Sequence, residues 1–468
     1  MPLIFIPILL NQFIELEINK DQDIKNKSQQ IQDEGDSEEK PSIEITHIKF
    51  NHIGPEIKEE VVIENTTDSL YMRKSFKESL KHRNYKGEGE WVKSLKRNEP
   101  ALYLINIKPI IKVRLKVNKL GLKSAKIKAV GKDSKIPNVI EKIVAFDEKG
   151  ISVGKDNTQY VEFQLDKPIS KTISKTIGNF KWVISGNPEN NEKDIDLEET
   201  GPHTFYTVLD RPTSPWNTIK KTQRPWESAL NFSIIKAGTK GLSKVENISK
   251  KITDFIYSSN NFNYDTKKGE SQFYKKFLLF NLTKAIGRKG QQIVNCDDVS
   301  LTITSSVTVL GIESNYTDII RFGYIKRASF IGIKKQVNSA VDREGSGLDT
   351  CIHGNQTNPP TKCDDDIIYD LPPHQRHPFI RHSISEIKIE NKLYIYDACV
   401  GTKELKPHIK VDSRPSFLRL TRDKSTARER DPYNNPYDFY AANLGKVTRL
   451  LIRPGEYEDF YPRKYQIK

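Results

Sequence analysis

The sequence predicts an α+β protein in which an N-terminal antiparallel, β-sandwich-like region precedes a domain that mixes helices and strands. Three observations support this prediction. Short stretches of alternating apolar and charged residues fill much of the segment from 41 to 186. Two segments with the helical spacing of apolar residues follow between 225 and 256. A helix start at Asn295-Cys296 and a hairpin pattern over 382–397 complete the mixed second half.

The composition is that of a folded chain with an excess of positive charge. The 468 residues are 36% hydrophobic, which supports real cores, and 75 basic against 61 acidic residues give a formal net charge of +14. Basic residues often alternate with apolar ones, and no helix-turn-helix, zinc-finger or RNA-binding pattern accompanies them, so we expect no nucleic-acid partner. No stretch approaches the roughly 20 apolar residues of a transmembrane helix, so we expect no integral membrane segment.

Residues 1–40 are expected to lie outside the main domains. Met1–Leu10 is apolar and predicts a strand that is buried or binds a partner. It lacks a basic n-region and a small-residue cleavage site, so we do not expect a signal peptide. The segment 19–40 is rich in Gln, Lys, Asp and Glu, which predicts a flexible linker. The four cysteines, at 296, 351, 363 and 399, are too few for a disulfide framework and leave the cellular compartment open.

The region 41–186 is predicted to consist of short antiparallel strands. Alternation is clearest over 111–117 and recurs over 160–165. Further strands are predicted at 60–64, 125–130, 139–146 and 179–185, with turns at 131–133 and 148–150. Many short strands separated by polar turns indicate a sandwich. No catalytic set of residues occurs in this region. We therefore expect it to be a module that binds a protein partner or that acts as a spacer.

A second polar segment, over 187–202, is predicted to be a linker after which the second domain begins at 203. Pro225 is expected in the first turn of a helix that ends at the glycines of 238–241. An amphipathic helix is predicted over 245–256 from apolar residues on one face. These helices are expected to support the segment around Cys296.

The stretch around Cys296 has the features of an activated thiol. Asn295 is a residue type that caps helices, and Asp297 and Asp298 would lie in the first turn. The free N–H groups and dipole of a helix start favour a thiolate and can hold a developing oxyanion. The alternative is a small buried apolar residue. The segment 299–310 is rich in Thr, Ser and Val and fits a strand as well as a helix, although the cap favours a helix.

A β-hairpin is predicted over 382–397, with its turn near Asn391. It would bring His382 close to Asp397, whose carboxylate could orient an imidazole. The most apolar register places Ser385 opposite Asp397 and leaves His382 out of phase by one residue, so a bulge near His382 would be needed. The alternative is a loop histidine and an exposed acid.

The residues around this cysteine, histidine and aspartate resemble the transglutaminase-like superfamily, which has a papain-like core, and within it bacterial-type multidomain members. The blocks that carry the resemblance are Gly290 to Asp298 with Leu310-Gly311-Ile312, His382-x-x-x-Glu386, Tyr396-Asp397-Ala398, and the upstream segment Ile252–Tyr264. Together they cover about 205–400. The resemblance implies a catalytic domain at 203–400 with a Cys-His-Asp site, and no cofactor or metal.

That resemblance implies a thiol enzyme that acts on an amide bond of a protein or peptide through a thioester on Cys296. Peptidase, deamidase and transamidase outcomes all fit it. His382 would act as the base and Asp397 would orient it. The oxyanion would rest on the Cys296 N–H and a second donor that the sequence does not identify. The alternative function is a non-catalytic binding protein that uses the β-rich region on a transglutaminase-like scaffold.

The gap between Cys296 and His382 is longer than is usual in the family, which we attribute to an insertion over 334–381. A zinc site there is conceivable, but the spacing of its Cys and His residues matches no standard pair of metal knuckles. A Cys351–Cys363 disulfide or an unliganded loop is the stronger expectation, and such a loop could influence specificity. The segment 401–468, rich in Arg, Tyr and Pro, is expected to pack on the core as a C-terminal extension.

Overall fold

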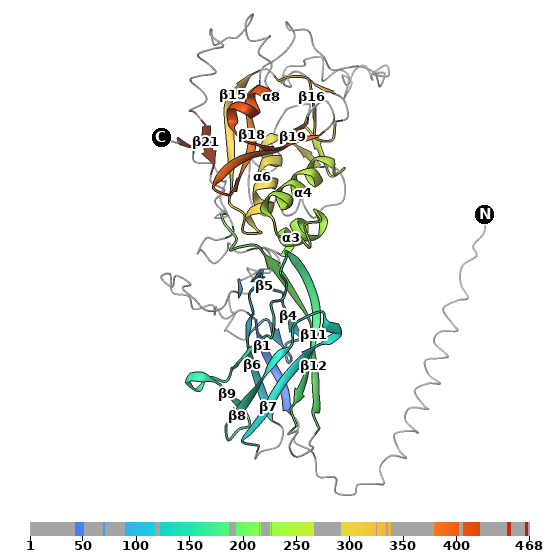
Figure 1. Cartoon of the computed structure of the whole chain (residues 1–468), viewed down its shortest axis with the longest axis vertical. Helices are drawn as coiled ribbons and strands as arrows, with labels where there is room; N and C mark the ends of the chain where they lie inside the picture. The colour runs from blue at the N-terminus through green and yellow to red at the C-terminus, as the bar shows by residue number, and fades with distance from the viewer. Residues whose placement is uncertain are drawn as a thin grey trace, which may run out of the picture.

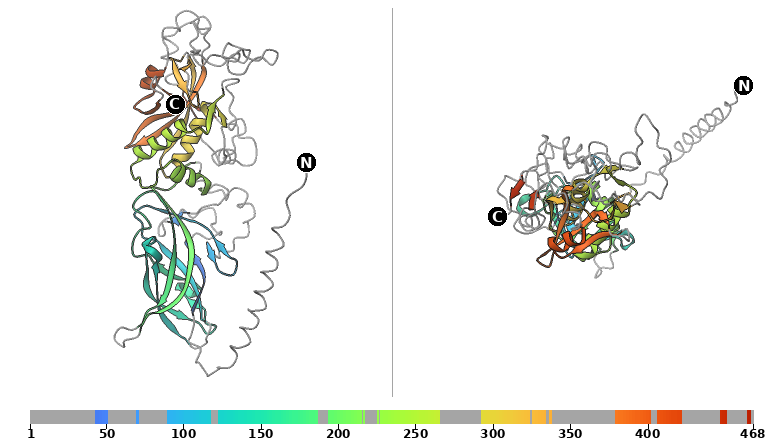
Figure 2. Two further views of the ribbon diagram at one scale, coloured as in Figure 1. Left: turned by 90° about the vertical axis from the view of Figure 1, so that its right-hand side faces the viewer. Right: turned by 90° about the horizontal axis from the view of Figure 1, so that it is seen from above.

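The computed structural model describes residues 43–50, 69–70, 89–117, 122–186, 193–214, 216, 225, 227–265, 292–323, 325–333, 336–337, 379–401, 406–421, 447–450 and 464–466. These residues form two bodies stacked along the long axis, a β-sandwich below and an α/β body above (Figure 1; Figure 2, left). Many strands and few helices make up the two, in agreement with the broad α+β class that the sequence predicts.

The β-sandwich consists of two sheets with the strand orders β10-β6-β1-β3-β4 and β2-β5-β12-β11-β7-β8-β9. All of their described pairings are antiparallel except β5 with β12, which is parallel. The elements are β1 (Ile43–Lys49), β2 (Ser69–Leu70), β3 (Trp91–Val92), β4 (Arg97–Asn98), β5 (Ala101–Leu104), β6 (Ile110–Val117), β7 (Ser124–Gly131), η1 (Lys132–Ser134), β8 (Val139–Phe146), β9 (Ser152–Val153), η2 (Lys155–Asn157), β10 (Val161–Gln164), β11 (Ser174–Ile184) and β12 (Ile195–Val208).

Alternation along the strands builds the sandwich core as predicted. In β6, Ile111, Val113 and Leu115 are fully buried, while Lys112 and Arg114 between them are partly exposed. Burial of such apolar side chains stabilises the sandwich by roughly 1.5–3 kcal/mol for each of them. The predicted strands near 111–117, 125–130, 139–146, 160–165 and 179–185 are therefore confirmed, whereas the one at 60–64 lies outside the described residues, as does the N-terminal segment 1–42.

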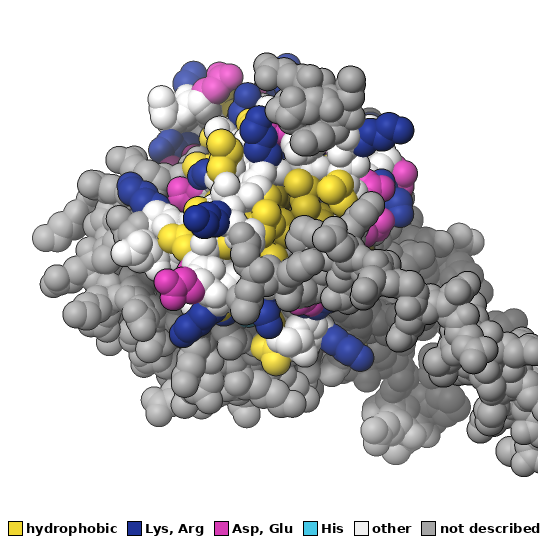
Figure 3. Space-filling view, turned by 90° about the horizontal axis from the view of Figure 1, so that it is seen from below, with side chains coloured by type: hydrophobic (Ala, Val, Ile, Leu, Met, Phe, Trp, Pro, Cys, Tyr) yellow, Lys and Arg dark blue, Asp and Glu magenta, His cyan; other side chains and the backbone are white. Residues whose placement is uncertain are grey.

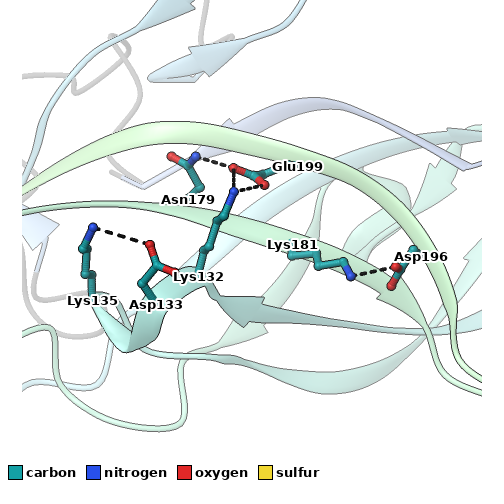
Figure 4. A network of polar contacts seen from close by, with 7 residues as sticks. All are labelled: Lys132, Asp133, Lys135, Asn179, Lys181, Asp196 and Glu199. Carbon is teal, nitrogen blue, oxygen red and sulfur yellow. Dashed lines mark hydrogen bonds and ion pairs between the residues drawn. The ribbon is translucent and has the colours of Figure 1, made fainter.

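The predicted linker over 187–202 is wrong for its second part, because β12 begins at Ile195. Its acidic residues pair with lysines of neighbouring segments (Figure 4). Lys181 contacts Asp196 at 2.6 Å, and Lys132 contacts Glu199 at 3.0 Å. Opposite charges side by side in this way support a strand that looks unstructured from its own composition. Residues 187–192 lie outside the described residues.

Seen from below, the free end of the sandwich carries a group of apolar side chains among charged ones (Figure 3). Ile143 and Ile195 are among the apolar side chains of the sandwich that are more than half exposed. They belong to β8 and β12, respectively.

In the α/β body, helices pack against a larger sheet, whose strand order is β17-β16-β19-β18-β15-β21-β22 with β20 beside β19. Helix α6 lies against β15, β18 and β19, and α4 lies beside it. The elements are α3 (Glu227–Leu230), the π-helix η4 (Asn231–Lys236), α4 (Val245–Ser258), β13 (Phe262–Tyr264), β14 (Gln292–Val294), α6 (Cys296–Thr308), β15 (Ser314–Gly323), β16 (Ala328–Phe330), β17 (Gln336–Val337), β18 (Phe379–Ile389), β19 (Lys392–Gly401), β20 (Pro407–Val411), α8 (Arg414–Thr421), β21 (Val447–Leu450) and β22 (Lys464–Gln466).

The predicted helices near 225–236 and 245–256 are confirmed as α3 with η4 and as α4. Among the helices of the described ranges, none combines the length and hydrophobicity that crossing a bilayer requires. The predicted insertion 334–381 is too long at both ends, because β17 and the start of β18 at Phe379 are strands of the sheet. Residues 338–378, with Cys351, Cys363 and the histidines near them, lie outside the described residues.

The two bodies share packing at the end of α6 that is farthest from Cys296. Leu102, Tyr206 and Val208, from strands of the sandwich, belong to the apolar core of the α/β body. The N–H of Leu209 donates to the carbonyl of Leu310 at 3.1 Å. The chain that leaves β12 therefore fastens the C-terminal end of the helix whose other end carries the cysteine.

Candidate active site

Cys296 occupies the first position of α6, as the sequence predicts. Asn295 and Asp298 form a capping box: the Asn295 Oδ1 accepts from the Asp298 N–H at 3.1 Å, and the Asp298 carboxylate accepts from the Asn295 N–H at 3.3 Å. Such a box satisfies two backbone donors that the first turn would otherwise leave without partners. The thiol is 6% exposed and free.

Helix α6 is buried along its whole length, although Ser and Thr make up much of it. Its hydroxyls bond in two directions. Within the helix, Thr302 donates to the carbonyl of Asp298 at 2.7 Å. Toward β18, Ser300 donates to the carbonyl of Ser383 at 2.7 Å, and Ser385 donates to the carbonyl of Ser300 at 2.8 Å. These contacts help to explain how a segment with strand-like propensity forms a buried helix, because the hydroxyls of Ser300 and Thr302 replace the water that they lose on burial.

The hairpin of β18 and β19 has a two-residue turn, Glu390-Asn391, with both φ angles positive at 48° and 65°. Its register pairs Glu386 with Ile395 and Ser385 with Tyr396. The predicted register was therefore wrong by one residue. The turn, not the most apolar pairing, sets the register, and both faces of this hairpin are buried, so apolarity discriminates poorly.

This register resolves the phase problem of the histidine. Because side chains alternate along a strand, His382 shares a face with Glu386, and Asp397 shares that same face with Ile395. No bulge is needed between β18 and β19 to bring the two side chains together. His382 is paired on its other side with Ile319 of β15, well inside the sheet.

The structure brings Cys296, His382 and Asp397 together. The Nε2 of His382 lies 2.8 Å from the Asp397 Oδ2, and Cys296 is the second hydrogen-bonding partner of the imidazole. The other oxygen of Asp397 accepts from the Cys399 N–H at 2.7 Å. His382 is 2% exposed and Asp397 is fully buried, so this hydrogen-bonded pair is shielded from solvent.

Burial by itself lowers the pKa of the His382 imidazole, but the charge of Asp397 and the hydrogen bonds to Asp397 and Cys296 outweigh burial and raise that pKa to about 10. An imidazole in this setting stays protonated at neutral pH as long as its anionic neighbours are charged. The site therefore favours an ion pair between the imidazole and its partners.

A second polar cluster lies beside the start of α6 and was missed by sequence reasoning. The Tyr316 hydroxyl lies 2.8 Å from a carboxylate oxygen of Asp297 and 2.8 Å from one of Asp318. The Ser383 hydroxyl lies within hydrogen-bonding distance of the same two oxygens. This cluster ties the first turn of α6 to β15 and β18.

Within the described ranges no three His, Cys, Asp or Glu side chains gather in a way that could hold a metal ion.

Tyr264 is paired with Val294, at the end of the strand that leads to Cys296. Burial and the charge of Cys296 raise the pKa of its phenol well above the usual value, so the hydroxyl keeps its proton. Its backbone N–H donates to the carbonyl of Ile331 at 3.0 Å, and β13 pairs in parallel with β14, the strand that leads into α6. The sequence placed Tyr264 in the segment upstream of the nucleophile but gave it no role.

Aromatic residues of the C-terminal segment also reach the site. The Phe417 ring is stacked on the His382 ring, with centroids 5.9 Å apart and planes inclined by 9°. His408 of β20 lies opposite Asp397 in the register of β19. Burial lowers the pKa of His408, which Asp397 partly offsets. No local signal in the sequence marks Phe417 or His408, because both depend on the path of the chain after β19.

No protein-family model matches the chain, and no curated protein matches it. Among solved structures, the crystal structure of red sea bream transglutaminase is similar, with a TM-score of 0.36 and 9% sequence identity. The match covers 74% of this chain and 55% of that chain, so this chain corresponds to about half the length of that protein.

Proposed function

We propose that the protein is a thiol acyl-transfer enzyme of the transglutaminase-like type, which acts on an amide bond of a protein or peptide through a thioester on Cys296. One observation carries the proposal: the buried imidazole of His382 is hydrogen-bonded both to Asp397, at 2.8 Å, and to a cysteine at the start of a helix. A nucleophile, a base and a group that orients the base are the parts that such chemistry requires.

The geometry supports a defined division of roles. Because Asp397 accepts at Nε2, the other ring nitrogen, Nδ1, is left to take the proton of the Cys296 thiol. The thiolate attacks the amide carbonyl, and the C–N bond breaks as the imidazolium returns a proton to the leaving amine. Water or a second amine then attacks the thioester and releases the thiol. The high pKa of His382 makes its imidazole a strong base toward the thiol.

Two groups are suited to hold the oxyanion of the tetrahedral intermediate. The first is the Cys296 N–H, which lies in the first turn of α6. The second is the Tyr264 hydroxyl, which retains its proton and lies close enough to feel the charge of Cys296. A phenol that stays neutral can donate to a developing negative charge in a site shielded from water.

If the thioester reacts with water, the enzyme is a peptidase or deamidase. If it reacts with an amine, the enzyme is a transamidase. That choice depends on which nucleophile reaches Cys296. A protein partner bound through the β-rich region remains a prediction.

The test is the reactivity of Cys296 with iodoacetamide near neutral pH, followed by mass spectrometry of the peptide that contains it. We expect alkylation at least about tenfold faster than that of a free cysteine peptide, because a thiolate is the reactive form. We also expect His382→Asn to remove this advantage. The buried thiol of Cys399 is an internal reference in the same sample. Equal rates for Cys296 and the peptide, unchanged by His382→Asn, would support the non-catalytic binding protein instead.

A further inference from the structure

Helix α8 lies outside the segment that resembles the transglutaminase-like superfamily, yet it packs directly on the histidine of the site. Phe417 is fully buried, and its ring is nearly parallel to the His382 ring, at 9°. On another side, Phe322 lies 5.0 Å from the His382 ring centroid at 52°. The imidazole is therefore held between aromatic rings, one of which comes from α8.

An ion pair with two hydrogen bonds fixes α8 to the strand that carries the histidine. The Arg414 Nε lies 2.7 Å from the Glu386 Oε1, and its Nη2 lies 2.9 Å from Oε2. Thr317 of β15 also donates to Oε2, at 2.8 Å. The Glu386 side chain is 4% exposed and that of Arg414 is 24% exposed, so the pair is largely protected from water. Paired, bidentate geometry of this kind fixes orientation as well as distance.

Both ends of α8 have further anchors, so the position of Phe417 is well defined. At the start, the Ser413 hydroxyl accepts from the Ser416 N–H at 3.3 Å. At the end, the Lys326 N–H donates to the carbonyl of Thr421 at 2.7 Å, and the Lys326 ammonium donates to the carbonyl of Arg419 at 2.7 Å. A cation at a helix C-terminus also stabilises the helix dipole.

We propose that Glu386, Arg414 and Phe417 are positioning residues for His382, an inference that rests on the proposed function. Glu386 and His382 share one face of β18, so the ion pair at Glu386 places α8 over the histidine. Arg414 and Phe417 are one helical turn apart and act together: the arginine docks the helix and the phenylalanine limits tilting of the imidazole. A ring held flat keeps Nε2 on Asp397 and its other nitrogen toward the thiol.

The experiment measures the pH profile of Cys296 alkylation by iodoacetamide in full-length variants. Phe417→Leu keeps an apolar side chain but removes the stacked ring, and Arg414→Ala releases the ion pair. We expect the rate near neutral pH to fall in both by up to about tenfold, toward the rate of His382→Asn, because a displaced imidazole activates the thiol less well, and the pH profile to shift. Arg414→Lys, which keeps the charge but not the fork, should restore part of the rate.

Two control variants match these changes without touching His382. Lys388→Ala breaks an exposed ion pair of the same strand, with Glu313 at 2.8 Å. Leu420→Ala alters an exposed apolar residue of α8 itself. Both should keep the wild-type pH profile. Circular dichroism reports whether each variant is folded, and if Arg414→Ala does not fold, Phe417→Leu alone decides the outcome.

The possible results separate the two proposals. If His382→Asn leaves Cys296 alkylation unchanged, the proposed function itself fails. If His382→Asn slows alkylation while Phe417→Leu and Arg414→Ala keep the wild-type rate and pH profile, the proposed function stands and the positioning role of α8 is overturned. Loss of rate in these two variants, with both controls unchanged, supports the positioning role.

Discussion

His382 stands at the centre of the site because it holds two partners at once while it is nearly sealed from solvent. Asp397 and Cys296 lie on different elements, and the imidazole joins them through hydrogen bonds. Burial lowers the pKa of the ring, but the charge and hydrogen bonds of its partners raise that pKa by more. The protonation of this single ring therefore links the chemistry of the site to the stability of the fold.

The pH dependence of stability follows from this shift. The folded-state pKa of His382 is raised from 6.5 to about 10, so its protonation stabilises the fold fully below about pH 6.5. That contribution is lost as the pH rises toward about 10. We expect urea unfolding to give a free energy that declines over this range in the wild type and declines less in His382→Asn. Parallel declines in the two proteins would contradict the assignment.

Tyr264 offers a test at the level of one hydroxyl group. If this hydroxyl donates to the oxyanion, Tyr264→Phe should slow acylation of Cys296 by p-nitrophenyl acetate by about 100-fold, the usual cost of removing one such donor. Alkylation by iodoacetamide forms no oxyanion, so its rate should stay at the wild-type value. Equal slowing of both reactions would point to a disturbed site and not to a lost donor.

At the scale of elements, the site depends on how α6 meets β18. Helix α6 carries the thiol and β18 carries the imidazole. The serine hydroxyls between α6 and β18 fix the separation of these two elements. Ser385 bonds the carbonyl of Ser300 at 2.8 Å and the hydroxyl of Thr304 at 3.1 Å. These bonds are buried, so breaking one of them leaves a buried polar group with no hydrogen-bond partner, because water does not reach it.

Ser385→Ala is expected to destabilise the protein by about 1–3 kcal/mol, because the partners of the hydroxyl remain buried. Thermal or urea unfolding measures the loss. Ser258→Ala is the matched control, since the Ser258 hydroxyl is exposed and bonds the Asp254 carbonyl of its own helix, at 2.6 Å. A similar effect in both variants would rule out a special contribution of the contact between α6 and β18.

The hairpin shows the limit of pattern reasoning at the same scale. Its existence and turn were predicted from the sequence, but its register was not. Ile387, Ile389, Leu393 and Ile395 suggested a pairing that the turn at Glu390-Asn391 excludes. Both faces of this hairpin are covered, so the apolar pattern could not identify one of them as the inner face.

At the scale of the whole molecule, the junction between the sandwich and the α/β body supports the end of α6. Gly311 follows that helix with φ of 85°, and a Cβ there would lie 2.1 Å from the carbonyl oxygen of Asp210, in the segment that leaves β12. The backbones of the two bodies meet here at a distance that only glycine permits.

Gly311→Ala is therefore expected to destabilise the protein by about 2 kcal/mol or more, because it adds a steric clash to the strain of a positive φ. Gly241→Ala isolates the strain, since Gly241 has φ of 88° and open space around it. We expect unfolding experiments to show a clearly larger loss for Gly311→Ala. Equal losses in the two variants would mean that the junction adapts to the side chain.

The sequence by itself determined the local features: the strands of the sandwich, the amphipathic α4, the helix cap at Asn295 and the approximate position of the hairpin turn. Each depends on residues close together in the chain, where propensity and periodicity act. Only the tertiary structure decided that the Ser- and Thr-rich helix bonds β18 through its hydroxyls, that residues 195–202 belong to a strand, and that Phe417 lies on His382. The partners in these cases lie on other elements, so these contacts depend on the path of the chain and not on local pattern.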